Sequence, residues 1–316
     1  MSRNTRLLPP VILGIVALVA VAYLVPFMRF VLTIALAKAL AVMGILLLLR
    51  AGQVSFGHAL YIATAAYTVA FMGQVAGLGE LFILLPLGML ASAVLGLVVG
   101  LFVTRYREIF FGMLNLAFSM VFYSVLEKAY HITKGTDGIR VGQPSVAFMM
   151  LPREQYEWVM FATATSLVLA AGLFCHRYLQ SPAGQALSAI KTRETRLEFA
   201  GLSARHALLL AYVLSAALAG AGGAIIAMTT RHVTPLLGYW TLSGELVFAA
   251  ILGGTGSVLG PVLGAVAFES VRVYAAAAFP NAWQMIMGVA LLALILFASR
   301  GVWGIYEDAM ARARRR

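Results

Sequence analysis

Long apolar runs follow one another along this chain of 316 residues, and short polar connections separate most of them. A helix needs about 20 mainly apolar residues to cross the hydrocarbon core of a bilayer. The sequence therefore predicts an all-α fold: a polytopic helical integral membrane protein with about ten transmembrane or re-entrant helices. We expect them near residues 7–27, 31–49, 57–73, 81–103, 109–127, 156–176, 206–228, 241–254, 261–279 and 283–299.

Two of these segments are less apolar than the rest. Residues 57–73 and 241–260 carry Gly, Ser, Thr, Gln or Glu among their apolar side chains. Non-helical backbone is tolerated at membrane depth only where protein or a water-filled cavity surrounds it. We therefore expect both segments to be re-entrant or broken helices, or else weak spans.

Composition excludes several other classes of protein. The chain is 62% hydrophobic and 11% charged, which is too much apolar surface for a soluble domain of this length to bury. Its net charge of +11 comes from basic residues at the ends of apolar runs, so we expect contact with membrane lipid and none with nucleic acid. Cys175 is the single cysteine, which leaves no internal disulfide and predicts no metal site.

The distribution of basic residues predicts an orientation. In the ten-span arrangement, fifteen Lys and Arg residues fall on the side of the two termini and six on the other side. Because basic residues concentrate on the cytosolic side, we expect cytosolic termini and an external loop at about 128–155. The first apolar run is long enough to be a retained span. Residues 1–316 would then form a single transmembrane domain.

A polar connection at about 177–205 stands out among the apolar segments, and it should lie in the cytosol. Ser181 followed by Pro182 is typical of a helix start. Leu187, Ile190, Glu194, Leu197 and Gly201 then recur at steps of three and four, which predicts one face of an amphipathic helix.

Three interpretations of this helix can be compared. It could rest on anionic lipid as a basic amphipathic helix. It is not a phosphate-binding loop, because Ile190 stands directly before Lys191, where such a loop has glycine. It could instead dock into a groove of a soluble protein partner. The carboxylate of Glu194 favours docking, because anionic lipid would repel it whereas a partner could supply a basic group.

Several long segments together resemble a known family. They are SPAGQALSAIKTRETRLEFAGLSARHALLLAYVLSAALAGAGGAIIA (181–227), AGQVSFGHALYIATAAYTVAFM (51–72) and WTLSGELVFAAILGGTGSVLGPVLGAVAFE (240–269). They are similar to branched-chain amino-acid ABC transporter permeases. The GTDG turn (135–138) and FFGMLNLAFSMVFYSV (110–125) resemble the LivM-like subunit of that family more than its LivH-like mate.

The resemblance implies an ABC-importer permease fold in the bacterial inner membrane. It implies three kinds of partner besides lipid: a LivH-like second permease, two ABC ATPase subunits and a periplasmic substrate-binding protein. ATP and Mg would be bound by the ATPases, so we expect no cofactor on this chain and no enzyme activity of its own. Leucine, isoleucine and valine are the family substrates, and relatives carry other amino acids, amides, urea or aromatic acids.

Candidate residues fall into two groups. The expected ATPase-coupling loop contains Gly184, Ala186, Leu187, Ile190, Arg193, Glu194, Leu197 and Gly201. Polar residues within spans are candidates for the translocation path, although helix packing explains each of them as well. These are Gln53, Ser55, His58, Asn115, Ser119, Tyr123 and Glu245.

The remaining charges within or near spans carry separate expectations. An unpaired Lys38 at mid-span would cost about 2.5–3.5 kcal/mol, so it should face a protein neighbour or an aqueous path. Glu269 and Arg272 are three residues apart and should neutralise each other. Glu80 has no charged neighbour in the sequence, so we expect Glu80→Gln to be nearly silent.

An ion-coupled secondary transporter of small polar solutes is the alternative function. Such a transporter should cluster carboxylates within the membrane. Only Glu245 and Glu269 are candidates for that cluster.

Overall fold

Helices dominate the computed structural model, which describes residues 8–75, 77–297, 301 and 303–304. The long helices are α1 (Leu8–Leu24), α2 (Pro26–Arg50), α3 (His58–Val75), α4 (Leu81–Val103), α5 (Glu108–Lys128), α7 (Arg153–Gln180), α8 (Pro182–Phe199), α9 (Ala204–Thr230), α10 (Trp240–Gly253), α11 (Leu259–Ala278) and α12 (Trp283–Phe297). The short elements are α6 (Tyr130–Thr133), η2 (Gly135–Asp137), η3 (Pro235–Gly238) and the antiparallel pair β1 (Ile139–Arg140) and β2 (His232–Val233). The predicted polytopic helical fold is confirmed, and within the described residues β1 and β2 form a short two-stranded departure from all-α.

Each of the ten predicted segments coincides with a long helix. Among the described residues, six helices are long and apolar enough to cross a membrane: α2, α4, α5, α7, α9 and α11. The two segments singled out as weak correspond to α3 and α10, which are not among these six, and α10 has only 14 residues. The helices α1 and α12, predicted as ordinary spans, are not among the six either, with 17 and 15 described residues. The expected termini and the last two residues of the tenth segment lie outside the described residues.

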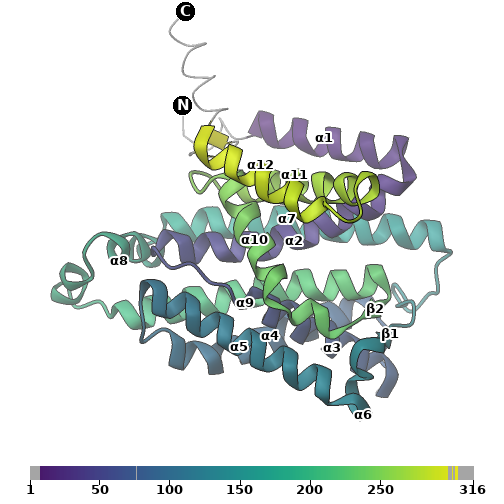
Figure 1. The fold of residues 1–316 in the computed structure, drawn as a ribbon, viewed down its shortest axis with the longest axis horizontal. Coiled ribbons are helices and arrows are strands. Elements are labelled where there is room, and N and C mark those ends of the chain that lie inside the picture. Colours follow the sequence, from purple (N-terminus) through teal and green to yellow (C-terminus); the bar gives the residue numbers. More distant parts are fainter. Residues whose placement is uncertain (1–7, 76, 298–300, 302, 305–316) are drawn as a thin grey trace, which may run out of the picture.

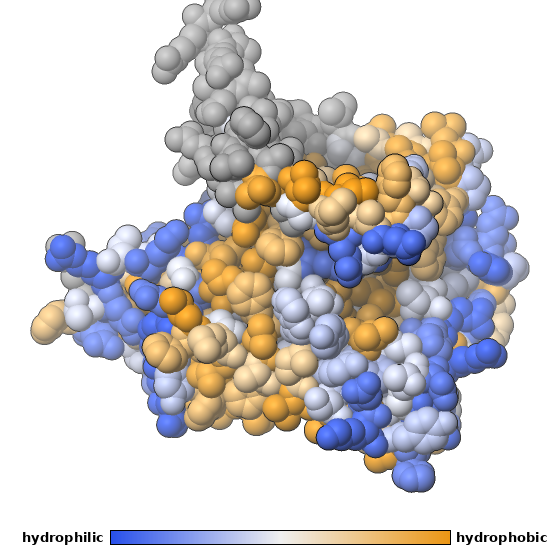
Figure 2. Space-filling model, viewed as in Figure 1, coloured by the Kyte–Doolittle hydropathy of each residue, from blue (hydrophilic) through white to orange (hydrophobic). Residues whose placement is uncertain are grey.

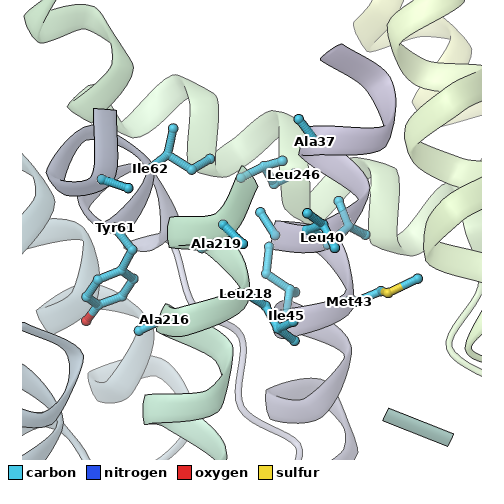
Figure 3. Close-up of a cluster of buried hydrophobic side chains, with 14 of the residues drawn as sticks. Ala37, Leu40, Met43, Ile45, Tyr61, Ile62, Ala216, Leu218, Ala219 and Leu246 are labelled. Atoms are coloured by element: carbon cyan, nitrogen blue, oxygen red, sulfur yellow. The ribbon is translucent and has the colours of Figure 1, made fainter. Parts of the chain in front are cut away.

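The centre of the bundle is formed by α2 and α9. The most apolar stretch of α2 is completely buried, because α7, α9, α10 and α11 pack around it. Figure 3 shows the contact, where Leu40 and Ile45 of α2 lie beside Leu218 of α9, with Ile62 of α3 nearby. The hydrophobic core of the protein therefore lies along α2, which other helices separate from the lipid.

Small residues let α9 approach its neighbours backbone to backbone. A Cβ added at Gly222 would overlap the carbonyl oxygen of Ala37 on α2, and one at Gly223 would overlap that of Ile62 on α3. Helix association in a membrane relies on such close packing, because lipid is as apolar as the helix surface. The Ala- and Gly-rich composition of α9 thus fixes its position against both helices.

Polar elements lie at opposite ends of the bundle. In Figure 1, α8 lies beyond one end of the long helices, while α6, β1 and β2 lie at the other. Figure 2 shows hydrophilic residues gathered at these two ends and a mostly hydrophobic surface between them. The segments 177–205 and 128–155 are therefore far apart along the helices, as a loop on each side of a membrane requires.

The turn at 146–149 is held by Glu80, which precedes α4. The Glu80 carboxylate is 5% exposed and accepts hydrogen bonds from the Ser145 hydroxyl (2.8 Å) and from the amides of Ala147 (2.8 Å) and Phe148 (3.0 Å). Ala147 and Phe148 have φ angles of 50° and 61°, which side-chain-bearing residues seldom adopt. The expectation that Glu80→Gln would be silent is therefore corrected, because the carboxylate stabilises a strained turn.

These hydrogen bonds also set the ionisation of Glu80. Burial alone would raise the pKa of this carboxyl group. The hydrogen bonds from Phe148, Ser145 and Ala147 favour the charged form and together outweigh burial, so the pKa lies below its ordinary value. Glu80 is thus held as a carboxylate at neutral pH.

Candidate functional site

The first part of α8 matches the predicted amphipathic helix. Pro182 is its first residue, and the Ser181 hydroxyl accepts a hydrogen bond from the amide of Gly184 (3.4 Å). Leu187 and Ile190 are buried, and α8 packs on α2, α7 and α9 of its own chain. Apart from Pro182 at its start, the exposed residues of this part are polar: Gln185, Ser188, Lys191 and Thr192. An apolar line therefore fixes α8 to the bundle and leaves a polar face uncovered.

The predicted single face does not continue through the helix. Arg193 has φ −157° and ψ 96°, an extended conformation that breaks α8 into two parts. Beyond the break, Leu197 is again buried, and Gly201 ends the segment with a left-handed φ of 79°. The expectation of one continuous apolar line from Leu187 to Gly201 is therefore wrong, because the periodicity of three and four cannot reveal a residue that leaves the helix.

Glu194 follows this break and has a partner within the chain. Its carboxylate accepts two hydrogen bonds from the Arg107 guanidinium, at 2.6 Å and 2.9 Å. Arg107 also donates to the carbonyl oxygens of Thr104 and Tyr106, so it is held by the connection between α4 and α5. The expected basic group is thus supplied by this protein itself, which corrects the expectation that a separate subunit supplies it.

The remaining loop candidates lie on the buried side. Ala186 is buried, and a side chain at Gly184 would overlap the backbone of Tyr178 at the end of α7. Gly184 thus permits the tight turn between α7 and α8. Neither Gly184 nor Ala186 belongs to the exposed polar face of α8.

The polar residues between α2 and α3 organise the local backbone. The Gln53 side chain accepts a hydrogen bond from the amide of Glu108 (2.7 Å) at the first turn of α5. The Ser55 hydroxyl accepts one from the amide of Gly57 (3.3 Å). His58 is fully buried, and its Nε2 lies 2.6 Å from the Ser215 hydroxyl of α9.

Candidates on α5 also have partners within the protein. Asn115 accepts a hydrogen bond from the Tyr212 hydroxyl, which in turn accepts one from Tyr61 (2.7 Å). The Ser119 hydroxyl donates to the carbonyl oxygen of Gly238 (2.9 Å). Tyr123 is half-buried and donates to Glu127 (3.2 Å).

The structure does not bring the predicted path residues around one cavity. Gln53, Ser55, His58, Asn115 and Ser119 are each buried and hydrogen-bonded within the chain. Tyr123 and Glu245 keep partial exposure, but they lie on different helices. This arrangement is that of interhelical hydrogen bonds, the explanation that sequence alone left open.

Four charged residues form one network inside the bundle. Lys38 of α2 contacts Glu245 of α10 at 3.1 Å and Glu269 of α11 at 2.8 Å. Glu269 also pairs with Arg272 of α11, as predicted. Two cations thus balance two carboxylates, and the expectation that Lys38 faces a protein neighbour is confirmed.

The sequence identified these four charged residues, but it did not predict that they contact one another. Each was visible as an ionisable residue in an apolar segment. The 207-residue separation of Lys38 and Glu245 gave no signal that α2 and α10 are neighbours. The pairing also does not favour the secondary transporter, since both carboxylates already have cationic partners.

An apolar belt between two polar ends, with charges paired inside the bundle, defines a multi-pass helical membrane protein. The family model for the permease component of branched-chain amino acid transport systems matches residues 27–296, so the chain belongs to that family. Membership places it among the permease components of transport systems.

Curated relatives agree with this membership. The chain is 28% identical over 270 residues to the high-affinity branched-chain amino acid transport system permease protein LivM of Salmonella typhimurium, and equally to that of Escherichia coli. These matches cover 78% of this chain and 62% of the relatives' length. BraD of Pseudomonas aeruginosa is 28% identical over 152 residues, covering 47% of this chain and 48% of BraD. No solved structure matches the chain at a significant level.

Proposed function

We propose that this protein is the LivM-like permease subunit of an ATP-driven importer of branched-chain or related amino acids. It would lie in the bacterial inner membrane with its termini and α8 in the cytosol. A second, LivH-like permease, two ABC ATPase subunits and a periplasmic substrate-binding protein would complete the system. ATP and Mg would be bound by the ATPases and not by this chain.

The polar face of α8 is the observation that carries the proposal. Leu187 and Ile190 pack against the helix bundle, while the side chains of Gln185, Ser188 and Thr192 are exposed at the end of the bundle. A helix that rested on lipid would turn its apolar line outward, toward the bilayer. The part of α8 before Arg193 has the opposite arrangement, apolar line inward and polar face outward, which suits a soluble partner such as an ATPase.

Two connections would carry motion from α8 into the membrane. Arg107 and Glu194 join α8 to the connection between α4 and α5. Only a short turn separates α8 from α9, which packs against α2, α3 and α4. A pull on α8 would thus move the central helix of the bundle and the start of α5 together.

The translocation path would lie beside this chain, because its centre is filled. Side chains of α2 and α9 leave no room between them, whereas Glu245 and Tyr123 keep partial exposure on α10 and α5. We place the path along this outer surface of α5 and α10, where a second permease subunit would close it.

Co-purification tests the proposal directly. Tagged protein extracted in mild detergent should bring two ATPases and a second permease, identified by mass spectrometry. Gln185→Trp should release the ATPases, because it places a bulky ring on the exposed face of α8. Gln155→Trp makes the same change at an exposed position on α7, at the opposite end of the bundle, and should leave the complex intact. Equal complexes from both variants would contradict docking at α8.

A further inference from the structure

A cavity of about 680 Å³ lies at the end of the bundle opposite α8. Its walls come from the first turns of α2 and α7, the end of α9 and the strands β1 and β2. None of the predicted path or coupling residues lines it. The cavity is therefore a feature separate from the proposed coupling surface.

Basic side chains dominate the cavity. Arg29, Arg140, Arg153, Arg231 and His232 line it, and Glu157 is the single carboxylate among the lining residues. Glu157 is shared, because it lies 3.1 Å from Arg153 and 3.9 Å from Arg29. Four guanidinium groups thus face one carboxylate, which leaves an excess of about three positive charges.

The excess positive charge is energetically unfavourable because one of the four arginines, Arg29, is buried. Its side chain is 5% exposed, its distance to Glu157 is beyond hydrogen-bond range, and its Nε has no hydrogen-bond partner among the described residues. The guanidinium lies over the Trp158 ring at 4.0 Å, which attracts the cation but satisfies no N–H group. Buried charges are normally both paired and hydrogen-bonded, whereas the Glu157 carboxylate lies 3.9 Å from Arg29 and is shared with Arg153.

Two turns of backbone bring the exposed arginines to the same place. Pairing of β1 with β2 sets Arg140 opposite His232. Arg231 ends α9 in the left-handed conformation, with φ 57°. This conformation is unusual for a residue with a side chain. The fold thus gathers basic residues from three distant parts of the sequence around the buried Arg29.

We propose that this cavity binds a phosphate-type oxyanion, supplied by the headgroup of an anionic phospholipid. Guanidinium groups pair with phosphate through parallel hydrogen bonds, which suits a cluster of arginines. Phe30 also lines the cavity and is 43% exposed, so the cavity adjoins apolar surface where acyl chains can lie. On the cytoplasmic side of membranes, basic pockets between helices bind lipid headgroups, and the same guanidinium–phosphate chemistry applies at this end of the bundle.

The experiment uses the full-length protein and a variant that keeps Arg29. Arg29→Gln could prevent folding, so the exposed pair is changed instead, in Arg140→Gln/Arg231→Asn. Asn tolerates the left-handed backbone at position 231. Lys134→Asn is the matched control, because Lys134 is an exposed basic residue that also caps a helix with φ 60° but does not line the cavity.

Binding is measured by native mass spectrometry with added phosphatidylglycerol, and with phosphatidylcholine of the same acyl chains. The wild type and Lys134→Asn should bind phosphatidylglycerol about tenfold more tightly than the double variant. Thermal unfolding in inorganic phosphate forms a second arm. Stabilisation by phosphate that the double variant loses would identify a free oxyanion as the ligand, which also supports the site.

One result would overturn the proposal: neither phosphatidylglycerol nor phosphate distinguishes the wild type from the double variant. Capture of the periplasmic binding protein by both proteins then shows what the arginines do instead. Suppose the double variant no longer captures it. The arginines would then be a docking surface for acidic protein side chains and not an oxyanion site.

Discussion

Arg107 and Glu194 join two segments 87 residues apart through two parallel hydrogen bonds. Planar guanidinium and carboxylate groups fit each other in this geometry, which lysine cannot reproduce. Both side chains are partly exposed, at 24% and 33%, so solvent weakens the pair. Its importance lies in what it connects, which is the broken helix α8 and the start of α5.

Glu194→Gln should uncouple transport without dismantling the complex. The amide keeps the shape of the side chain but loses the ion pair, so we expect a loss of about 0.5–1 kcal/mol in stability and a clear fall in ATP-driven uptake. Blue-native gels should still show bound ATPases. Glu198→Gln, an exposed change on the same helix, is the control. Release of the ATPases by Glu194→Gln alone would instead show that Glu194 contacts them directly.

Glu80→Gln should loosen the turn at 146–149. Glutamine offers one neutral acceptor where the carboxylate offers two charged oxygens, so we expect a cost of about 1–2 kcal/mol. Hydrogen exchange at the amides of Ala147 and Phe148 should become faster. Glu154→Gln, at an exposed position in the first turn of α7, should leave both amides protected.

The same turn should respond to acid. Because the pKa of Glu80 is lowered in the folded protein, its contribution to stability is complete above the ordinary value of 4.5 and is lost as the pH falls through the lowered value. Protection of the Phe148 amide should decline over that range in the wild type and stay flat in Glu80→Gln. Parallel decline in both proteins would assign the effect to other groups.

Lys38→Met should be severely destabilising, because it leaves two carboxylates facing only Arg272 inside the bundle. Removal of one partner from a buried ion pair costs about 3–5 kcal/mol. Adding Glu245→Gln restores the balance of charge and should recover much of the folded yield, measured by fluorescence-detected size-exclusion chromatography. Wild-type yield and melting temperature for Lys38→Met alone would mean that the lysine reaches water.

Gly253→Ala should destabilise the contact between α10 and α11, whereas Gly244→Ala in the same helix should not. A Cβ at Gly253 would overlap the carbonyl oxygen of Gly260, while one at Gly244 has no atom within 4 Å. Overpacking of this kind costs about 1–3 kcal/mol. Thermal unfolding in detergent compares the two, and equal melting temperatures would show that α10 can move aside.

The predicted orientation can be tested with single cysteines at Thr136 and Thr192. Both positions are exposed, and the native Cys175 is fully buried. An impermeant maleimide should label position 136 from outside the cell and position 192 only after the membrane is opened. Labelling of both from one side would contradict the topology.

Apolar runs and helix signals predicted most of the fold. They placed ten helices, marked α3 and α10 as weak, and located the start of α8 at Pro182 and its end near Gly201. These features depend on residues close together in the chain, where periodicity and capping act.

The site was harder to predict, because its contacts join distant segments. The sequence predicted that Glu194 pairs with a basic group of another protein and that Glu80 has no partner. The residues that bind these two carboxylates are not close to them in the sequence. Their partners, Arg107 and the turn at 146–149, are brought to them only by the packing of whole helices. The break in α8 at Arg193 likewise could not be predicted, because no Pro or Gly lies next to Arg193 in the sequence.

The 27 residues of α9 make it about 40 Å long. It begins beside the turn that leaves α8 and ends at Arg231, on the wall of the arginine-lined cavity. Because α9 is one continuous helix, a displacement of its first turn also displaces its last turn. In the proposed mechanism, whatever holds Arg231 in place would also resist a pull on α8, so the two ends of the bundle would share one mechanical element.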